Sequence, residues 1–141
     1  MKKIFTLLFL TLSTAIFSAT QYKDGLYVVK AEKPSYDWYS VIEITISNGS
    51  ISKVEAEDYN IKNEKRTNDT AGNQYMKSKY GYDFTDVVAN FTKKLMVNGN
   101  LSTVDAIAGA TLSNNIYKSL ATQALKKAET GSTSQSIINS K

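Results

Sequence analysis

The sequence of 141 residues contains no cysteine and no histidine, and it contains a single proline. Without cysteine there is no disulfide framework, no thiolate metal site and no cysteine-ligated iron–sulfur cluster. Without histidine there is no Ser-His-Asp triad, no histidine-ligated haem and no side chain that naturally titrates near neutral pH. Any electron-transfer or hydrolytic chemistry must therefore rest on other groups, and we expect no protein-held metal.

The charge of the chain is only mildly positive. There are 17 lysine and arginine residues against 13 aspartate and glutamate residues, which gives a net charge of +4. Removal of Lys2 and Lys3 with the N-terminal segment described next leaves 15 basic residues and a net charge near +2. Nucleic-acid binding needs a concentrated basic face, and the remaining basic residues lie among acidic and polar neighbours. We therefore expect no nucleic-acid partner.

Residues 1–19 have the pattern of a bacterial signal peptide. A positive start is followed by an apolar run from Ile4 to Phe17 and by the small residues Ser18 and Ala19. The run is too short and too interrupted by polar residues for a membrane span, although an uncleaved anchor remains the alternative. The pattern predicts an exported protein, located in the periplasm, at the cell surface or outside the cell, and membrane-associated if the signal is retained.

Three strands are expected in the first half of the mature chain. The segment Leu26 to Ala31 is rich in tyrosine and valine, and Val41 to Ser47 alternates between apolar and polar residues. Asn48-Gly49 is a strong signal for a two-residue hairpin, and Ile51 to Ala56 is the returning strand. These segments predict three strands in meander order.

Helices are expected in the second half. After a polar loop over residues 59–73 and a short helix over 74–79, apolar residues spaced by three or four run from Phe84 to Leu95. Asp83 or Thr85 can cap this helix, and a second helix is predicted over residues 113–128. Strands followed by helices indicate an α+β fold, with a small antiparallel sheet packed against two C-terminal helices. The folded domain spans residues 22–129, and the serine-rich residues 130–141 are expected to be a disordered tail.

One segment, Val104 to Ser113, combines small residues with a hydroxyl residue at the start of a helix. Ala108, Gly109 and Ala110 allow a ligand to approach the backbone closely, and Thr111 follows them. The unpaired N–H groups at a helix start suit a phosphate. The alternative is a tight turn in which Thr111 or Ser113 serves as a helix cap.

This segment resembles the signature of the FMN-binding domain family. That family includes flavin-carrying subunits of membrane redox complexes and small exported flavoproteins. Its pattern is Asp, two variable residues, Ser or Thr, Gly, Ala, and Thr or Ser. Asp105, Gly109, Ala110 and Thr111 match the pattern, whereas Ala108 replaces the usual hydroxyl residue.

The resemblance extends beyond the signature. Asp24-Gly25-Leu26-Tyr27 is similar to the opening of the small exported members, and the hairpin around Asn48-Gly49 is similar to their next element. The helix that ends at Ala128 fits the end of the domain. The likeness thus covers about residues 22–129 in the same order.

The resemblance implies that FMN is joined through a phosphodiester bond to the hydroxyl of Thr111 by a separate flavin transferase that uses FAD. Gly109 and Ala110 would give the phosphate room, and Asp105 would belong to the recognition sequence. From helix geometry we expect Leu112 and Ser113, in the first turn, to hold the phosphate through hydrogen bonds. Several aromatic residues could cover the isoalloxazine ring, and among them we select Trp38; the candidates are Tyr27, Tyr36, Trp38, Tyr39 and Tyr59.

The resulting hypothesis is an exported electron carrier, not a stand-alone enzyme, that receives electrons from membrane redox proteins. FMN would supply the redox chemistry that the chain lacks. Because Ala108 departs from the family pattern, two alternatives stay open: FMN bound without a covalent bond, and a secreted binding or surface-antigen domain that has lost the flavin. A hydrolytic enzyme is disfavoured because no pair of carboxylates is placed convincingly.

Overall fold

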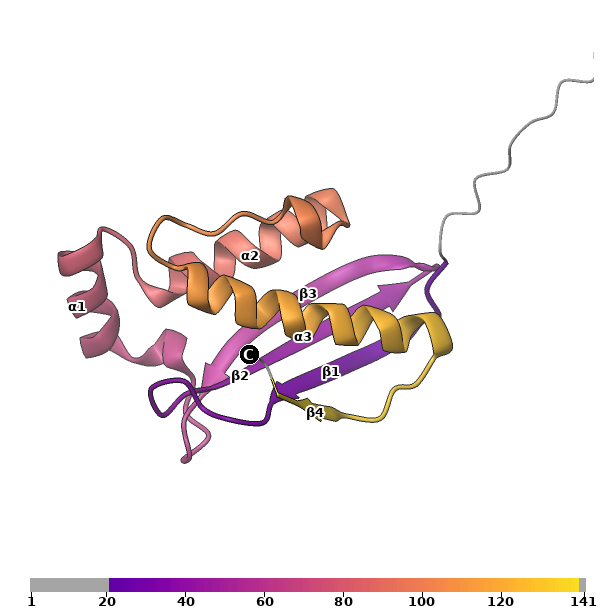
Figure 1. Cartoon of the computed structure of the whole chain (residues 1–141), viewed down its shortest axis with the longest axis horizontal. Helices are drawn as coiled ribbons and strands as arrows, with labels where there is room; N and C mark the ends of the chain where they lie inside the picture. Colours follow the sequence, from indigo (N-terminus) through magenta and orange to yellow (C-terminus); the bar gives the residue numbers. More distant parts are fainter. Residues whose placement is uncertain (1–20, 140–141) are drawn as a thin grey trace, which may run out of the picture.

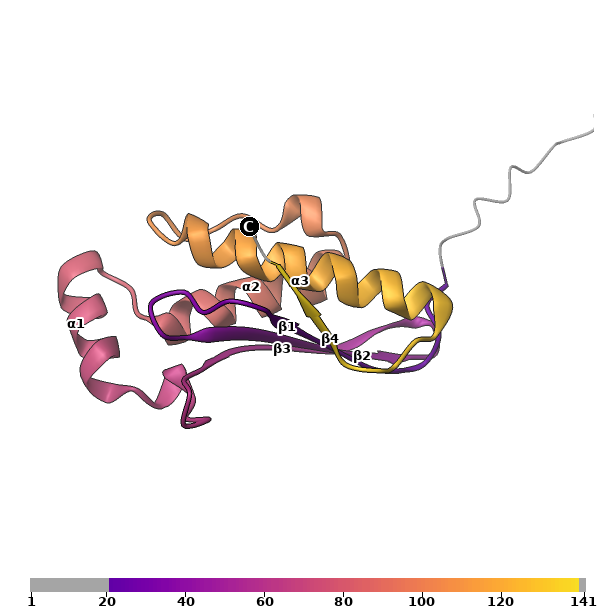
Figure 2. The ribbon, with the colours of Figure 1, turned by 60° about the horizontal axis from the view of Figure 1, so that its bottom comes forward.

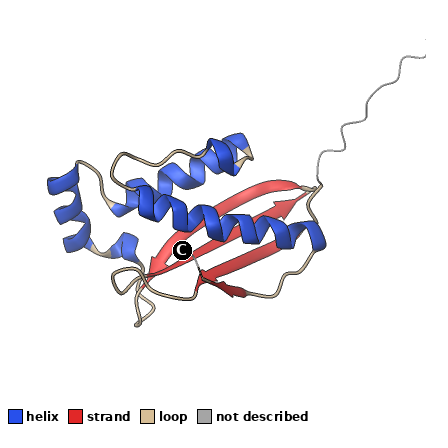
Figure 3. Ribbon diagram, viewed as in Figure 1, coloured by secondary structure: helices blue, strands red, loops and turns tan. Residues whose placement is uncertain are grey.

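The protein is a two-layer α+β domain in which one face of a mixed sheet is covered by helices (Figure 1, Figure 2). The computed structural model describes residues 21–139; the predicted signal peptide lies outside them. The strand order is β3-β2-β1-β4. The elements, coloured by type in Figure 3, are β1 (Gly25–Ala31), β2 (Tyr39–Ser47), β3 (Ser50–Tyr59), the 3-10 helix η1 (Arg66–Asn68), α1 (Thr70–Tyr80), α2 (Phe84–Asn98), the 3-10 helix η2 (Leu101–Thr103), α3 (Thr111–Thr130) and β4 (Ser136–Ile138).

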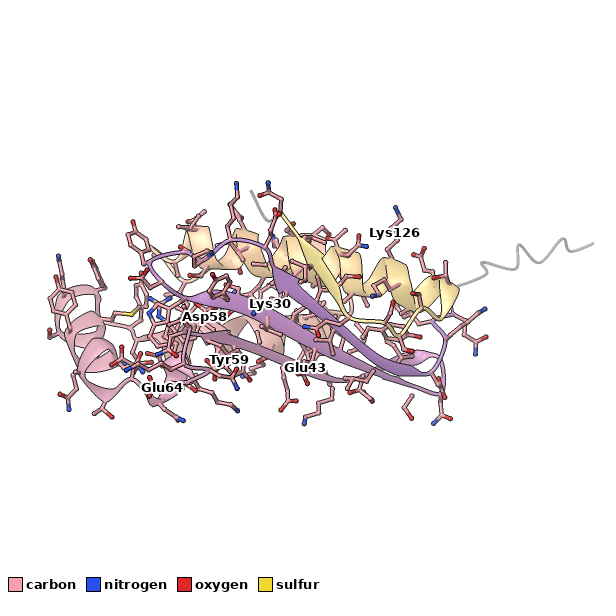
Figure 4. The ribbon with its side chains drawn as sticks, turned by 90° about the horizontal axis from the view of Figure 1, so that it is seen from below. Lys30, Glu43, Asp58, Tyr59, Glu64 and Lys126 are labelled. Atoms are coloured by element: carbon pink, nitrogen blue, oxygen red, sulfur yellow. The ribbon has the colours of Figure 1, made fainter. Side chains whose placement is uncertain are left out.

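The antiparallel meander β1-β2-β3 confirms the predicted strands and their order. Asn48 and Gly49 form the turn between β2 and β3 with φ values of 52° and 75°, which is the positive-φ geometry of a tight hairpin. Alternate residues of the strands point toward the helices, so Ile42 and Ile44 are fully buried. The opposite face of the sheet carries Lys30, Glu43 and Tyr59 and has no helix over it (Figure 4).

Helices α2 and α3 pack on the sheet and complete the apolar core. Helix α2 begins with a capping box between Asp83 and Asp86, and its buried residues are the predicted stripe. Helix α3 begins at Thr111, two residues before the predicted start, and contacts β1 and β2. Small fully buried residues on α3, such as Ala121 and Ala124, allow the helix to lie close to the strands.

The predicted loop over residues 59–73 is partly helical. It contains η1, and α1 begins at Thr70 because the Asp69 side chain accepts a hydrogen bond of 3.1 Å from the backbone N–H of Gly72. The predicted helix over 74–79 is therefore longer than expected, although it ends at Gly81 as predicted, with φ of 81°. No residue of α1 is buried, so the helix has no apolar stripe that would reveal its start.

The tail predicted to be disordered contains a strand. Residues 136–138 form β4, which pairs in parallel with β1, so the prediction is wrong for these residues. The ammonium group of Lys127, on a side chain that is only 6% exposed, donates a hydrogen bond of 2.6 Å to Ser136 Oγ and another to the carbonyl of Ser134. The buried ammonium group of Lys127 thus anchors β4 to the end of α3. The serine-rich sequence of the tail gives no sign of this contact. Among the described residues no helix is long and apolar enough to cross a membrane.

We predict that Lys127→Met releases β4 and leaves the rest of the fold intact. Methionine keeps the apolar stem but removes two charge-assisted hydrogen bonds, each worth about 1.5–3 kcal/mol. The Glu32 amide, which donates to the Ile138 carbonyl at 2.7 Å, should exchange with solvent at least about tenfold faster. Lys126→Met, at the neighbouring exposed position, is the control (Figure 4). Unchanged exchange at Glu32 in Lys127→Met would contradict this role.

Candidate functional site

A cavity of about 700 Å³ lies at the end of the sheet where β1 and β3 finish. Most of its lining comes from four segments: the loop between β1 and β2, the 3-10 helix η1, one side of α1, and the residues around the start of α3. Tyr82 and Val87 complete it. In Figure 1 these segments meet on the left of the molecule, next to α1. The opposite end of the sheet holds the Asn48-Gly49 turn and the C-terminal end of α3, so the cavity belongs to one end only.

The small-residue segment before α3 forms one wall of this cavity. Gly109 has φ of 92°, and a Cβ atom there would stand 3.0 Å from the hydroxyl of Tyr82, another lining residue. A side chain at this position would therefore both strain the backbone and occupy the cavity. Four predicted site residues and the adjacent Ala108 form this wall; the four are Gly109, Ala110, Leu112 and Ser113.

The N-terminus of α3 lacks a side-chain cap. Ala110 occupies the cap position and offers no acceptor, whereas Asp69 and Asp83 cap α1 and α2. The first amides of α3 therefore receive no hydrogen bond from a capping side chain, and they point out of the helix at its positive end. Thr111, the first residue of α3, is exposed and does not itself line the cavity. As the first residue of the helix, Thr111 stands at its positive end, where amides without a side-chain cap suit an anion.

Asp105 lies outside the cavity and is exposed. Its backbone carbonyl accepts hydrogen bonds of 2.9 Å from Asn90 Nδ2 and 2.9 Å from Lys94 Nζ, both on α2. These bonds fasten the segment that precedes Gly109 to the neighbouring helix. The structure thus separates Asp105 from the other predicted site residues.

The predicted aromatic candidates divide between the cavity and other places. Trp38 and Tyr36 line the cavity from the loop between β1 and β2. Tyr27 is fully buried in the core, where its hydroxyl donates to the carbonyl of Lys23. The other two candidates, Tyr39 and Tyr59, are register partners of β2 and β3, and they lie on the face that no helix covers.

Arg66 is a cavity residue that the sequence analysis missed. It lines the cavity from η1, and it is the sole arginine of the chain. Its Nη1 atom lies 3.0 Å from Oδ2 of Asp58, which is 3% exposed at the end of β3 (Figure 4). Its guanidinium also lies over the ring of Phe84, 4.4 Å from the centroid. Cation–π contact and a buried ion pair together hold this side chain in one place.

Tyr117 completes the buried network. Its hydroxyl donates a 2.6 Å hydrogen bond to Oδ1 of Asp58, so both carboxylate oxygens are engaged. Burial, followed by the charge of Asp58, raises the pKa of Tyr117 well above its usual value, which keeps the hydroxyl protonated. Asp58 and Tyr117 are 59 residues apart, so no local pattern could have joined them. The one sequence feature that could have drawn attention to Arg66 is that it is the single arginine among many lysines.

The wall formed by α1 is fixed by Asn73. Its Nδ2 atom donates to the carbonyls of Arg66 and Thr67 at 3.1 and 3.2 Å, and its Oδ1 accepts from the Phe84 amide at 3.1 Å. One side chain thus connects η1, α1 and the start of α2. Aromatic side chains, a guanidinium and the uncapped first turn of α3 consequently line one space. This donor set fits a planar aromatic ligand that carries an anionic group. Within residues 21–139 no cluster of acidic side chains is suited to hold a metal.

We predict that Tyr117→Phe lowers the free energy of unfolding by about 1.5–3 kcal/mol near neutral pH, because Asp58 loses a charge-assisted hydrogen bond. The raised pKa of Tyr117 adds a pH signature. Its contribution is complete below about pH 10, the pKa of an unfolded tyrosine, and is lost as the pH rises through the folded pKa. Denaturant titrations at pH 8 and pH 11 should therefore show a smaller difference between wild type and variant at pH 11. An equal difference at both pH values would contradict the assignment.

The comparisons with known proteins concern the fold. The crystal structure of the CPE2226 protein from Clostridium perfringens superimposes with a TM-score of 0.79 and 28% sequence identity, over 84% of this chain and 98% of that protein. The name of that protein states no ligand and no activity. No protein-family model matches the sequence, and the curated proteins give no match. The architecture of this domain is thus similar to that of a solved bacterial protein.

Proposed function

We propose that the protein is an exported electron carrier that holds FMN, joined through a phosphodiester bond to Thr111. The observation that carries the proposal is the convergence of Trp38 with the small-residue segment 108–113 on one cavity, although some 70 residues separate them. The segment was selected for its small residues and its resemblance to the family signature, and Trp38 was selected as an aromatic residue that could cover the cofactor ring. A tight turn with a helix cap would not require an aromatic side chain from a distant loop at the same place.

The residues present fit the cofactor. Thr111 would supply the hydroxyl oxygen that bonds to the phosphorus of FMN, with FAD as donor, AMP as leaving group and release of the hydroxyl proton. The amides of Leu112 and Ser113 would hold the phosphate oxygens, and the absence of a Cβ atom at Gly109 keeps the space open. Trp38 would cover the ring. When bound, FMN supplies one- and two-electron chemistry for which the chain has no cysteine or histidine.

A covalent bond suits an exported carrier for a physical reason. Outside the cytoplasm free FMN is dilute, and a reversibly bound cofactor would be lost by mass action. A phosphodiester removes this dependence on concentration. Electron donors would be membrane redox proteins, and a flavin transferase would be the partner that attaches the cofactor.

The test of the proposal is co-expression of the mature domain with a flavin transferase. Mass spectrometry should find FMN on the peptide that contains Thr111, and the purified protein should absorb as a flavin. Thr111→Val preserves the shape of the side chain and removes the hydroxyl, so covalent label should fall below detection.

Thr122→Val is the matched control, because Thr122 is an exposed threonine on the same helix. It should retain full labelling. If wild-type protein carries neither label nor flavin absorbance after co-expression, the proposal is wrong. Label that persists in Thr111→Val would place the attachment at another residue.

Ala108 favours a second candidate, a secreted binding domain without flavin, because it lacks the hydroxyl of the family pattern. This residue is exposed and lines the cavity, so a hydroxyl side chain can be accommodated. We expect Ala108→Thr to increase the initial rate of flavin attachment severalfold, measured as label against time with limiting transferase. Ala106→Thr, two residues earlier in the same segment, serves as control. An unchanged rate would show that the missing hydroxyl has no part in attachment.

A further inference from the structure

We propose that Arg66 recognises the negative charge of the reduced cofactor ring and thereby raises the reduction potential of the bound FMN. This inference rests on the proposed function. Two electrons from a low-potential reductant and one proton from water give the ring a single negative charge near neutral pH. A fixed cation in the wall of the site binds that form more tightly than the neutral oxidised form, and a positive charge beside the ring is a means by which proteins tune flavins.

The position of Arg66 supports this role. Its side chain is 21% exposed and lines the cavity, whereas Asp58, its ion-pair partner, is not among the lining residues. The carboxylate thus stands behind the guanidinium and the guanidinium stands toward the ligand space. A guanidinium has five N–H donors. One donates to Oδ2 of Asp58 and one to the sulfur of Met76 at 3.9 Å. Within the described part of the chain, the remaining N–H groups are available to a ligand oxygen.

The choice of arginine also supports it. A lysine would be sufficient for a surface ion pair, and every other basic residue of the chain is a lysine. Arginine stays charged in a partly buried site and stacks on aromatic rings, which lysine does less well. Here the guanidinium lies 4.4 Å from the centroid of Phe84 and 5.7 Å from that of Trp38, the residue proposed to cover the cofactor ring. The charge and the aromatic cover are therefore adjacent.

Asp69 is the other charged residue of the cavity wall. Its Oδ1 atom accepts a hydrogen bond of 3.1 Å from the Gly72 amide and caps α1. The carboxylate thus compensates the start of a helix, while the guanidinium of Arg66 has donors left over. Arg66 is the cationic side chain among the residues that line the cavity.

The test compares reduction potentials of flavin-loaded protein. Replacing Arg66 alone would strand the buried charge of Asp58, so the main variant is Arg66→Gln/Asp58→Asn, which removes both charges. We expect this variant to bind the reduced ring ten- to a hundredfold less tightly relative to the oxidised ring. For a two-electron couple this is a midpoint potential about 30–60 mV more negative. Dithionite titration monitored by flavin absorbance gives the value.

The pH dependence supplies a readout that a purely structural role would not change. Uptake of one proton with two electrons gives a slope of about 30 mV per pH unit, and uptake of two protons gives about 59 mV. Wild-type protein should show the smaller slope already at pH 6, because the cation favours the charged ring. The double variant should keep the larger slope to higher pH. Arg66→Lys retains the charge and should restore the smaller slope.

Lys53→Gln/Glu55→Gln is the matched control, because it removes an exposed ion pair of β3 without changing the net charge. It should leave the potential and the slope unchanged. If wild-type protein carries no flavin, both the proposed function and this inference fail. If it carries flavin but the double variant has the same potential and slope, the role of Arg66 alone is wrong. Should the double variant not fold, a wild-type slope of about 59 mV at pH 6 would by itself overturn the inference.

Discussion

The buried carboxylate of Asp58 is the constraint on which one end of the molecule depends. An ionised group that is 3% exposed is costly unless its oxygens are paired, and here Arg66 pairs with one oxygen and Tyr117 with the other. These partners come from η1 and α3, so the need to compensate one charge on β3 brings three elements together. Asn73 then ties α1 to η1. This network positions the cavity walls together with the apolar packing of lining residues such as Val87 and Ala110.

The molecule thus combines two kinds of stabilisation. Between the helices and the middle of the sheet the core is apolar, with Ile42, Ile44 and Leu120 fully buried. At the end of β3 the packing gives way to hydrogen bonds, an ion pair and cation–π contacts. Such polar networks are sensitive to the loss of one member and hold their groups in fixed positions. The fixed positions suit a site where a ligand must meet a charge and an aromatic ring together.

The elements stabilised by apolar burial could be predicted from the sequence, whereas those stabilised by polar contacts could not. The alternation of Val41 to Ser47, the Asn48-Gly49 turn and the stripe that begins at Phe84 reflect apolar burial, and the structure confirms all three. The first turn of α1 and the strand β4 were missed because capping by Asp69 and a buried Lys127 stabilise them, which leaves no periodic signal. The segment before α3 was selected for its small residues and its family resemblance, and Trp38 was selected for its aromatic ring. Arg66 was missed because its partners are distant in sequence.

The hairpin turn at Asn48-Gly49 has a consequence for how the domain can be attached to other structures. The backbone amide of Tyr22 donates to the carbonyl of Gly49 at 3.3 Å, so the described chain enters the fold at this turn (Figure 1). Strand β3 runs from there to the cavity over 10 residues, a span of about 33 Å at the rise of a strand. Any segment joined ahead of residue 21 is therefore attached at the pole opposite the cavity. A tether at that pole would leave the mouth of the cavity facing outward, free to approach another molecule.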